Sequence, residues 1–210
     1  MPVTKFNQRQ ETIYQRDQYV KGGIGRWHWD KRDKLALNLV RPAHRTLVDI
    51  GCGEGITLEK MYRLFPDRKV LGIDILLENI DICRRYGCKV EQGDVYNLPL
   101  PSKSVDFVLF MEVIEHLEYP ETAIQEIHRV LVPGGRLVIV FPNDRFFKIA
   151  RILTLRFREA AYDPGHVRQW IPHEMRDFLN GQGFTSTFSR NIPFYFWLIS
   201  LHCIMAVDKK

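Results

Sequence analysis

The sequence is poor in cysteine and lacks a dominant sign of charge. It has 4 cysteines with no Cys-x-x-Cys pair, so their spacing indicates no paired site. Lys and Arg total 30, Asp and Glu total 25, and the net charge is +5. That charge permits an anionic partner, but a nucleic-acid-binding surface would need it clustered on one face. The first residues show no signal-peptide pattern, so we expect free thiols and a cytoplasmic protein.

Long apolar runs are also missing. The most apolar stretch, residues 194–199, is shorter than the roughly 20 residues of a membrane-spanning helix. We interpret it as core or as one wall of an apolar substrate pocket. A chain of 210 residues suits one well-buried domain better than two. We expect a single domain with an N-terminal helical lid at 1–44, a ligand-binding core at 45–143, and a substrate-side lid with closing strands at 144–210.

The chain is organised around a short apolar run followed by alternating glycines. Residues Thr46–Ile50 have the continuous apolar character of a strand buried on both faces. Gly51, Gly53 and Gly55 then allow a sharp turn that can approach a ligand closely. Ile56 occupies the place of the third small residue of a dinucleotide fingerprint, and no Lys-Ser/Thr pair follows the glycines as in a P-loop. Both of those ligand classes are therefore disfavoured.

Acidic residues end the next two predicted strands, on the same edge of the sheet. Asp74 closes the strand at 69–75 and lies about twenty residues past the glycines, the spacing that brings an acid to a ribose in a βαβ unit. A competing interpretation makes Asp74 only the N-cap of the following helix. Asp94 and Val95 follow the strand at 89–94. There an acid can accept the exocyclic amine of an adenine, while Val95 offers an N–H and an apolar face.

The remaining pattern alternates strands and helices, which predicts an α/β fold. Further strands are expected at 105–111, 136–142, 185–191 and 201–207, the last two as an antiparallel pair, and helices at 33–41, 56–65, 76–86, 120–131 and 172–183. Gly22, Gly23 and Gly25 are expected to break the polar and aromatic leading segment. The tryptophans Trp27 and Trp29 of that segment are expected to dock on the core, where they can also form a lid over the ligand.

Five motifs, at 48–55, 72–74, 93–94, 106–116 and 131–135, resemble the class I S-adenosylmethionine (SAM)-dependent methyltransferases in order and spacing. The resemblance implies a Rossmann-like seven-stranded, mostly parallel sheet with helices on both faces and a reversed C-terminal hairpin. It also implies methyltransferase activity, with SAM as cofactor and S-adenosylhomocysteine as product. The cofactor-binding residues that it implies are Asp49, Gly51, Cys52, Gly53, Gly55, Asp74, Ile75, Asp94, Val95 and Met111. Among these, the glycines would lie along the methionine part of SAM, and Met111 would lie near its sulfonium.

Titratable residues gather after the fourth predicted strand. Glu112, Glu115 and His116 are spaced three and four apart, so on a helical turn they would share a face. With a distant His166, this set resembles the ubiquinone-pathway O-methyltransferases and the small-RNA 3′-end 2′-O-methyltransferases. In both families these residues are associated with a divalent cation that helps to ionise a hydroxyl. The alternatives are a structural turn, or a general base for which His116 and His166 are the catalytic candidates.

The acceptor is less constrained than the cofactor. The leading interpretation is O-methylation of a small or lipid-like acceptor, with an RNA 2′-O-methyltransferase and a non-catalytic SAM-binding module as alternatives. Nucleic acid is disfavoured because basic residues are not concentrated near the motif. Residues 145–158 predict an amphipathic helix whose basic face either is solvated, or binds an anionic substrate or a membrane surface. The sequence leaves the acceptor and the oligomeric state open.

Overall fold

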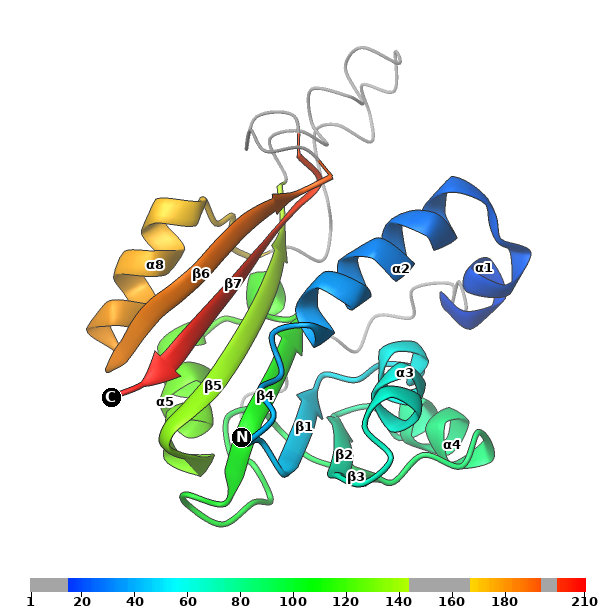
Figure 1. Ribbon diagram of the computed structural model, residues 1–210, viewed down its shortest axis with the longest axis horizontal. Helices are drawn as coiled ribbons and strands as arrows, with labels where there is room; N and C mark the ends of the chain where they lie inside the picture. Colours follow the sequence, from blue (N-terminus) through cyan, green and yellow to red (C-terminus); the bar gives the residue numbers. More distant parts are fainter. Residues whose placement is uncertain (1–14, 144–166, 194–199) are drawn as a thin grey trace.

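One seven-stranded sheet runs through the protein, which we describe from a computed structural model covering residues 15–143, 167–193 and 200–210. Its strands are β1 (Thr46–Ile50), β2 (Lys69–Asp74), β3 (Val90–Gln92), β4 (Val105–Met111), β5 (Leu131–Pro142), β6 (Phe184–Ile192) and β7 (His202–Lys209). Their order in the sheet is β3-β2-β1-β4-β5-β7-β6 (Figure 1). Strands β1 to β5 pair in parallel, whereas β7 is antiparallel to both β5 and β6. The predicted mostly parallel sheet with a reversed C-terminal hairpin is confirmed.

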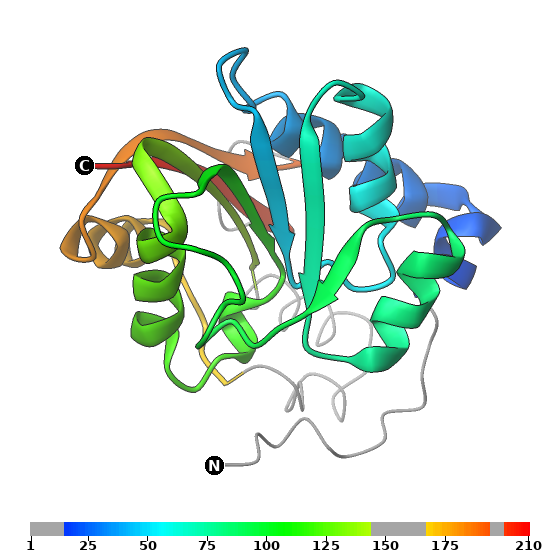
Figure 2. The ribbon, with the colours of Figure 1, turned by 90° about the horizontal axis from the view of Figure 1, so that it is seen from below.

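Helices cover both faces of this sheet. They are α1 (Gln15–Lys21), α2 (Gly23–Leu37), α3 (Ile56–Leu64), α4 (Leu77–Arg85), α5 (Pro120–Val130) and α8 (Pro172–Gly181), with a short 3-10 turn η2 (Ile114–His116). One buried apolar cluster joins α5 and α8 to one face, and a second joins α2, α3 and α4 to the other. Figure 2 shows α5 and α8 grouped together, away from α3 and α4.

The burial of each strand follows from its sequence. In β4 every residue except Asp106 is buried, and in β1 only Thr46 is partly exposed. Continuous apolar runs of this kind are typical of parallel strands that are covered on both faces. The edge strand β6 instead alternates more and less buried positions, because one of its faces lies toward water.

The strand order indicates which end of the sheet binds a ligand. It reverses between β1 and β4, and open α/β sheets bind ligands at such a switch point, outside the carboxyl ends of the strands. These ends of β1, β2 and β4 lie together near the start of α3 (Figure 1). Within the part of the chain that the structure describes, no helix is both long and apolar enough to cross a membrane.

The N-terminal region differs from the sequence prediction. The helix expected at 33–41 instead spans Gly23–Leu37, so Gly25 lies inside it. Gly22 and Gly23 do form the expected break, with φ angles of +80° and +83°. Each glycine inside a helix costs about 1 kcal/mol relative to alanine, so local propensity does not explain this helix.

Contacts with α3 explain it. Asp33 of α2 is fully buried, and its carboxylate accepts hydrogen bonds from the Thr57 hydroxyl (3.0 Å) and the Lys60 ammonium (2.7 Å). The same carboxylate is paired with Arg32 at 3.0 Å. A buried carboxylate with this many donors fixes α2 against the fold, and this anchoring overrides the local preference of the glycines.

Candidate functional site

The glycine loop forms a tight left-handed turn between β1 and α3. Gly51, Gly53 and Gly55 have φ angles of +74°, +53° and +79°, a conformation that is strained for residues with a Cβ atom. A Cβ at Gly51 would lie 2.3 Å from a methyl carbon of Val113. The turn therefore needs glycine both for its backbone angles and for the close approach of the segment that follows β4.

Asp74 connects this loop to the end of β2. One carboxylate oxygen accepts the Gly53 N–H at 2.8 Å, and the other accepts the Leu76 N–H at 2.9 Å and the Asn79 amide at 3.1 Å. The side chain thus holds the glycine loop and the segment that leads into α4. The expectation that Asp74 is the N-cap of this helix is wrong, because Leu76 is the N-cap. A carboxylate has about four acceptor sites, so three donors leave room for a ligand hydroxyl.

An exposed apolar edge lies beside Asp74. Ile75, Leu76 and Leu77 are all exposed to solvent, although they directly follow a buried strand. On the neighbouring strand end Asp94 is exposed, and Val95 is partly buried against the core. An Asp94 carboxylate oxygen accepts the N–H of Tyr96 at 2.9 Å. This edge can cover a flat apolar ring and still offer an acceptor for its amine.

Asp49 and Met111 are buried at the ends of β1 and β4. Burial, together with the nearby carboxylates of Asp33 and Asp74, raises the pKa of the Asp49 carboxyl to about 8, against an opposing effect of Arg32. An acid kept neutral in this way is typical of functional sites. The Asp49 carboxyl can therefore ionise when a positively charged group binds beside it.

The sequence analysis did not identify Glu54 and Arg16 as partners. The Glu54 carboxylate accepts the backbone N–H groups of Gln15 (2.9 Å) and Arg16 (2.8 Å). The Arg16 guanidinium donates to the Glu54 carbonyl, pairs with Glu59 at 2.6 Å, and lies 3.6 Å from the Tyr86 ring centre. The start of α1 is therefore attached to the glycine loop and to the end of α4.

Two further histidines were also missed. Glu112 directly follows β4 with a φ of +56°, and its Oε1 lies 3.2 Å from Nε2 of His202. Nδ1 of His202 lies 3.0 Å from Nε2 of His28, which is buried in α2. Burial and, to a smaller extent, the neighbouring His202 lower the pKa of His28 to about 4. The chain His28–His202–Glu112 thus reaches the carboxyl end of β4.

The expectation that Glu112, Glu115 and His116 share a helical face is wrong for Glu112. The turn η2 covers only Ile114–His116, and the positive φ of Glu112 directs its side chain to His202 instead. Glu115 and His116 do stay together, with Oε1 and Nε2 4.0 Å apart. His166 and the segment 145–158 lie outside the described residues. Within residues 15–143, 167–193 and 200–210, no three His, Cys, Asp or Glu side chains form a set that could hold a metal ion.

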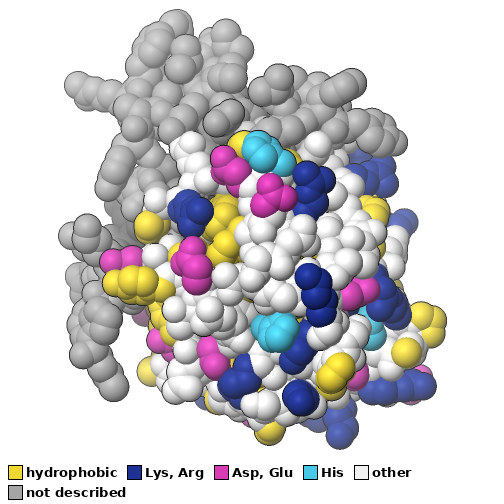
Figure 3. All heavy atoms as spheres, turned by 90° about the vertical axis from the view of Figure 1, so that its left-hand side faces the viewer, with side chains coloured by type: hydrophobic (Ala, Val, Ile, Leu, Met, Phe, Trp, Pro, Cys, Tyr) yellow, Lys and Arg dark blue, Asp and Glu magenta, His cyan; other side chains and the backbone are white. Residues whose placement is uncertain are grey.

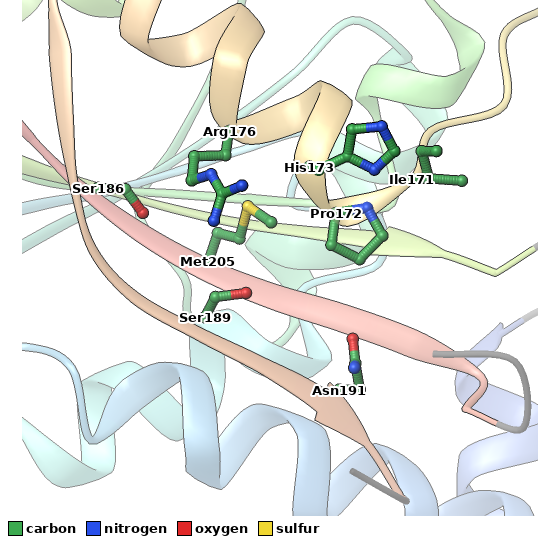
Figure 4. A pocket seen from close by; sticks show the side chains of 8 residues that line it. All are labelled: Ile171, Pro172, His173, Arg176, Ser186, Ser189, Asn191 and Met205. Carbon is green, nitrogen blue, oxygen red and sulfur yellow. The ribbon is translucent and has the colours of Figure 1, made fainter. Parts of the chain in front are cut away.

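The described part of the surface has one depression beside the glycine loop and another on a different flank. One of about 330 Å³ lies between α1, the glycine loop and α4, and is lined by Arg16, Asp17, Glu54, Ile82, Arg85 and Tyr86. The other, of about 390 Å³, lies between α8 and β6 (Figure 4). There His173 and Arg176 project from α8, and Ser189 and Asn191 from β6. Figure 3 shows this flank, where side chains of both charges are interspersed. No residue that lines this second depression belongs to the glycine loop.

Comparison with known proteins identifies the fold family. Residues 48–139 match the methyltransferase domain family. A probable S-adenosylmethionine-dependent methyltransferase of Mycolicibacterium smegmatis is 32% identical over 163 residues, which cover 75% of this chain and 59% of that protein. This chain therefore spans less than two thirds of that relative.

Shorter matches include proteins with different acceptors in their names. A fatty-acid O-methyltransferase of Mycolicibacterium smegmatis is 33% identical over 49% of this chain and 39% of its own. A probable tRNA methyltransferase of Bos taurus is 36% identical over 44% of this chain and 20% of its own. Among solved structures, a SAM-dependent methyltransferase of Thermotoga maritima has a TM-score of 0.70 at 22% identity, covering 92% of this chain and 95% of that one. The chain thus has the fold of a solved SAM-dependent methyltransferase, and its residues 48–139 match the methyltransferase domain family.

Proposed function

We propose that the protein is a SAM-dependent methyltransferase that transfers a methyl group to an oxygen of a small or lipid-like acceptor. The observation that carries the cofactor assignment is the arrangement at the ends of β1 and β2. There a left-handed glycine turn is bonded to Asp74 beside an exposed apolar edge. The family match supports the activity, and the fatty-acid O-methyltransferase among the relatives supports the class of acceptor.

The described residues fit this cofactor part by part. The turn at Gly51 to Gly55 lets the methionine part approach the backbone closely, because glycine has no Cβ atom, and the remaining acceptor site of Asp74 suits a ribose hydroxyl. Ile75 offers an apolar surface to the adenine, and Asp94 offers an acceptor to its amine. The neutral Asp49 carboxyl lies where it could ionise beside the positively charged ammonium group of a bound ligand.

Methyl transfer to an oxygen has two requirements that the protein must meet. Bound SAM would supply a methyl group on a sulfonium, and the protein must hold an acceptor oxygen in line with that methyl group. It must also accept the proton that the oxygen loses. His116 is a candidate base, because its side chain is 25% exposed just past β4. His202, paired with Glu112 at the same edge, is a second candidate.

A calorimetric titration of S-adenosylhomocysteine tests the cofactor assignment. We expect micromolar binding to the wild-type protein and at least tenfold weaker binding to Asp74→Asn, which removes the charge but keeps an oxygen acceptor for the loop. Asp81→Asn on the exposed face of α4 is the matched control and should bind normally. Wild-type protein without S-adenosylhomocysteine binding would refute the proposed function.

An acceptor screen with labelled SAM then tests the substrate class. Methyl transfer to fatty acids or phenols would support the proposal. A transfer rate that rises with added Mg²⁺ or Mn²⁺ would show that a divalent cation takes part. RNA is the second candidate, favoured by the tRNA methyltransferase among the relatives. It predicts methyl incorporation that RNase abolishes and that weakens steeply with salt. Tight cofactor binding without turnover on any acceptor would indicate a non-catalytic SAM-binding module.

A further inference from the structure

The first two helices present apolar side chains to solvent that the proposed chemistry does not use. Val20, Ile24 and Trp27 are 72%, 86% and 55% exposed. Along α2, Ile24, Trp27, Lys31 and Lys34 follow one another at intervals of three, four and three residues, so they share one face of the helix. We call this face of α2, together with Val20, the outer face.

The buried side of α2 explains why these residues stay outside. His28 and Asp33 point into the fold, where they bond to His202 and Lys60. These buried polar contacts fix the rotation of α2 about its axis. The apolar side chains of the outer face therefore cannot turn inward without breaking them.

The charge around the outer face is positive. Lys21 and Arg26 are exposed beside it, and the Lys31 ammonium lies 4.9 Å from the Trp27 ring centre. The half-exposed Asp30 is shared between Lys60 at 2.7 Å and Arg26 at 3.7 Å. Among the residues that the structure describes, no acidic side chain forms an ion pair with Lys21, Lys31 or Lys34. An apolar strip with a basic border is complementary to an anionic lipid surface, which offers a negative head-group layer above an apolar interior.

We propose that the outer face of α1 and α2 docks on an anionic membrane surface. Tryptophan and aliphatic side chains would enter the head-group boundary, and the lysines would meet the lipid phosphates. α2 leads from above the end of β4 out to α1 (Figure 1), and α1 is bonded to the glycine loop through Glu54. Docking would thus bring the ligand-binding edge close to the bilayer. Docking itself does not depend on the proposed function. Only the further inference that a lipid-like acceptor reaches the site from the membrane rests on it.

Vesicle co-sedimentation tests the proposal with the full chain. We expect the protein to bind vesicles of phosphatidylcholine mixed with phosphatidylglycerol, to bind pure phosphatidylcholine much more weakly, and to dissociate as salt is raised. Lys31→Glu with Lys34→Glu should weaken binding to the mixed vesicles at least about tenfold, since each basic residue near such a surface contributes about 1 kcal/mol. Trp27→Asp should weaken it similarly by removing the apolar anchor. Leu64→Asp, at an exposed apolar position that ends α3, is the matched control.

S-adenosylhomocysteine titration of each variant separates docking from folding and from the proposed function. Variants that lose vesicle binding but keep the wild-type affinity for S-adenosylhomocysteine support the proposal. Wild-type protein that binds S-adenosylhomocysteine but ignores anionic vesicles overturns the docking proposal and leaves the function intact. Equal loss of vesicle binding in Leu64→Asp also overturns it. So does a dimer in solution that Trp27→Asp dissociates, because a second copy would then be the partner of this face.

Discussion

Replacing Asp49 by Asn should stabilise the ligand-free protein, by an amount that grows with pH. The pKa of Asp49 is about 8 in the folded chain instead of 3.8, chiefly because the carboxyl is buried, with added repulsion from Asp33 and Asp74. The folded state therefore binds a proton that the unfolded state releases between pH 4 and pH 8. Wild-type stability must fall over this window as pH rises, whereas an amide at this position has nothing to titrate.

The magnitude follows from the size of the pKa change. Each pH unit between the two pKa values is worth about 1.4 kcal/mol. The stability difference between Asp49→Asn and wild type should therefore grow by about 1 kcal/mol from pH 4 to pH 5 and reach about 4 kcal/mol at pH 7. Urea denaturation of both proteins at several pH values from 5 to 8 measures it. Any constant offset between carboxyl and amide cancels, since only the slope with pH is used.

The same variant should bind S-adenosylhomocysteine less well. If a ligand ammonium lies beside Asp49, its charge favours the carboxylate, so binding to the wild type below pH 8 should release a proton. Calorimetry in two buffers of different ionisation enthalpy detects that proton, and Asp49→Asn should show none. Stability curves of the two proteins that run parallel from pH 5 to pH 8 would refute the reasoning, because Asp49 would then have an ordinary pKa.

Three further predictions concern the loop, pH and the sheet. Gly51→Ala should lose most S-adenosylhomocysteine affinity by calorimetry, because its Cβ would overlap Val113 at 2.3 Å; Gly87→Ala has a similar φ of +77° with nothing within 4 Å and should bind normally. His28 has a pKa of about 4 in the folded protein instead of the ordinary 6.5. The free energy of unfolding should therefore fall by up to about 3 kcal/mol as pH falls from 6.5 to 4, because only the unfolded state takes up the proton. In acid denaturation His28→Gln should lack this loss of stability, and a profile identical to that of the wild type would contradict the prediction. Asp208→Ala should destabilise the protein by about 3 kcal/mol in urea denaturation, because the buried Arg136 of β5 loses its carboxylate partner at 2.8 Å. A loss of stability below about 1 kcal/mol would show that water replaces the pair.

The sheet was predictable because its signals are local. The run Thr46–Ile50 became β1 and residues 105–111 became β4, within the predicted limits. Pro120 opens α5 as expected, because a proline at the first turn has no N–H to leave unpaired. Each of these signals lies within a single element. The order of the acids at 49, 74 and 94 likewise follows from strand ends that share one edge of the sheet.

The extent of α2 was not predictable in this way. Gly25 indicated a break that does not occur, and Asp33 is held by α3 through Lys60, which lies 27 residues further along the chain. Such contacts exist only once the sheet has brought α2 and α3 to the same face. Local propensity was therefore the weaker term, as is common where a buried ion pair fixes a helix.

The sequence by itself determined the positions of most strands, the glycine turn and the acids at the strand ends, because periodicity, glycine and motif spacing are properties of neighbouring residues. Only the tertiary structure decided which side chains share that edge. His28 and His202 are 174 residues apart in the chain yet 3.0 Å apart in space, and Glu112 joins them rather than its sequence neighbours Glu115 and His116. The reason is physical: distant pairs carry no period along the chain, and one positive φ at Glu112 redirects a side chain that helical spacing would have placed elsewhere.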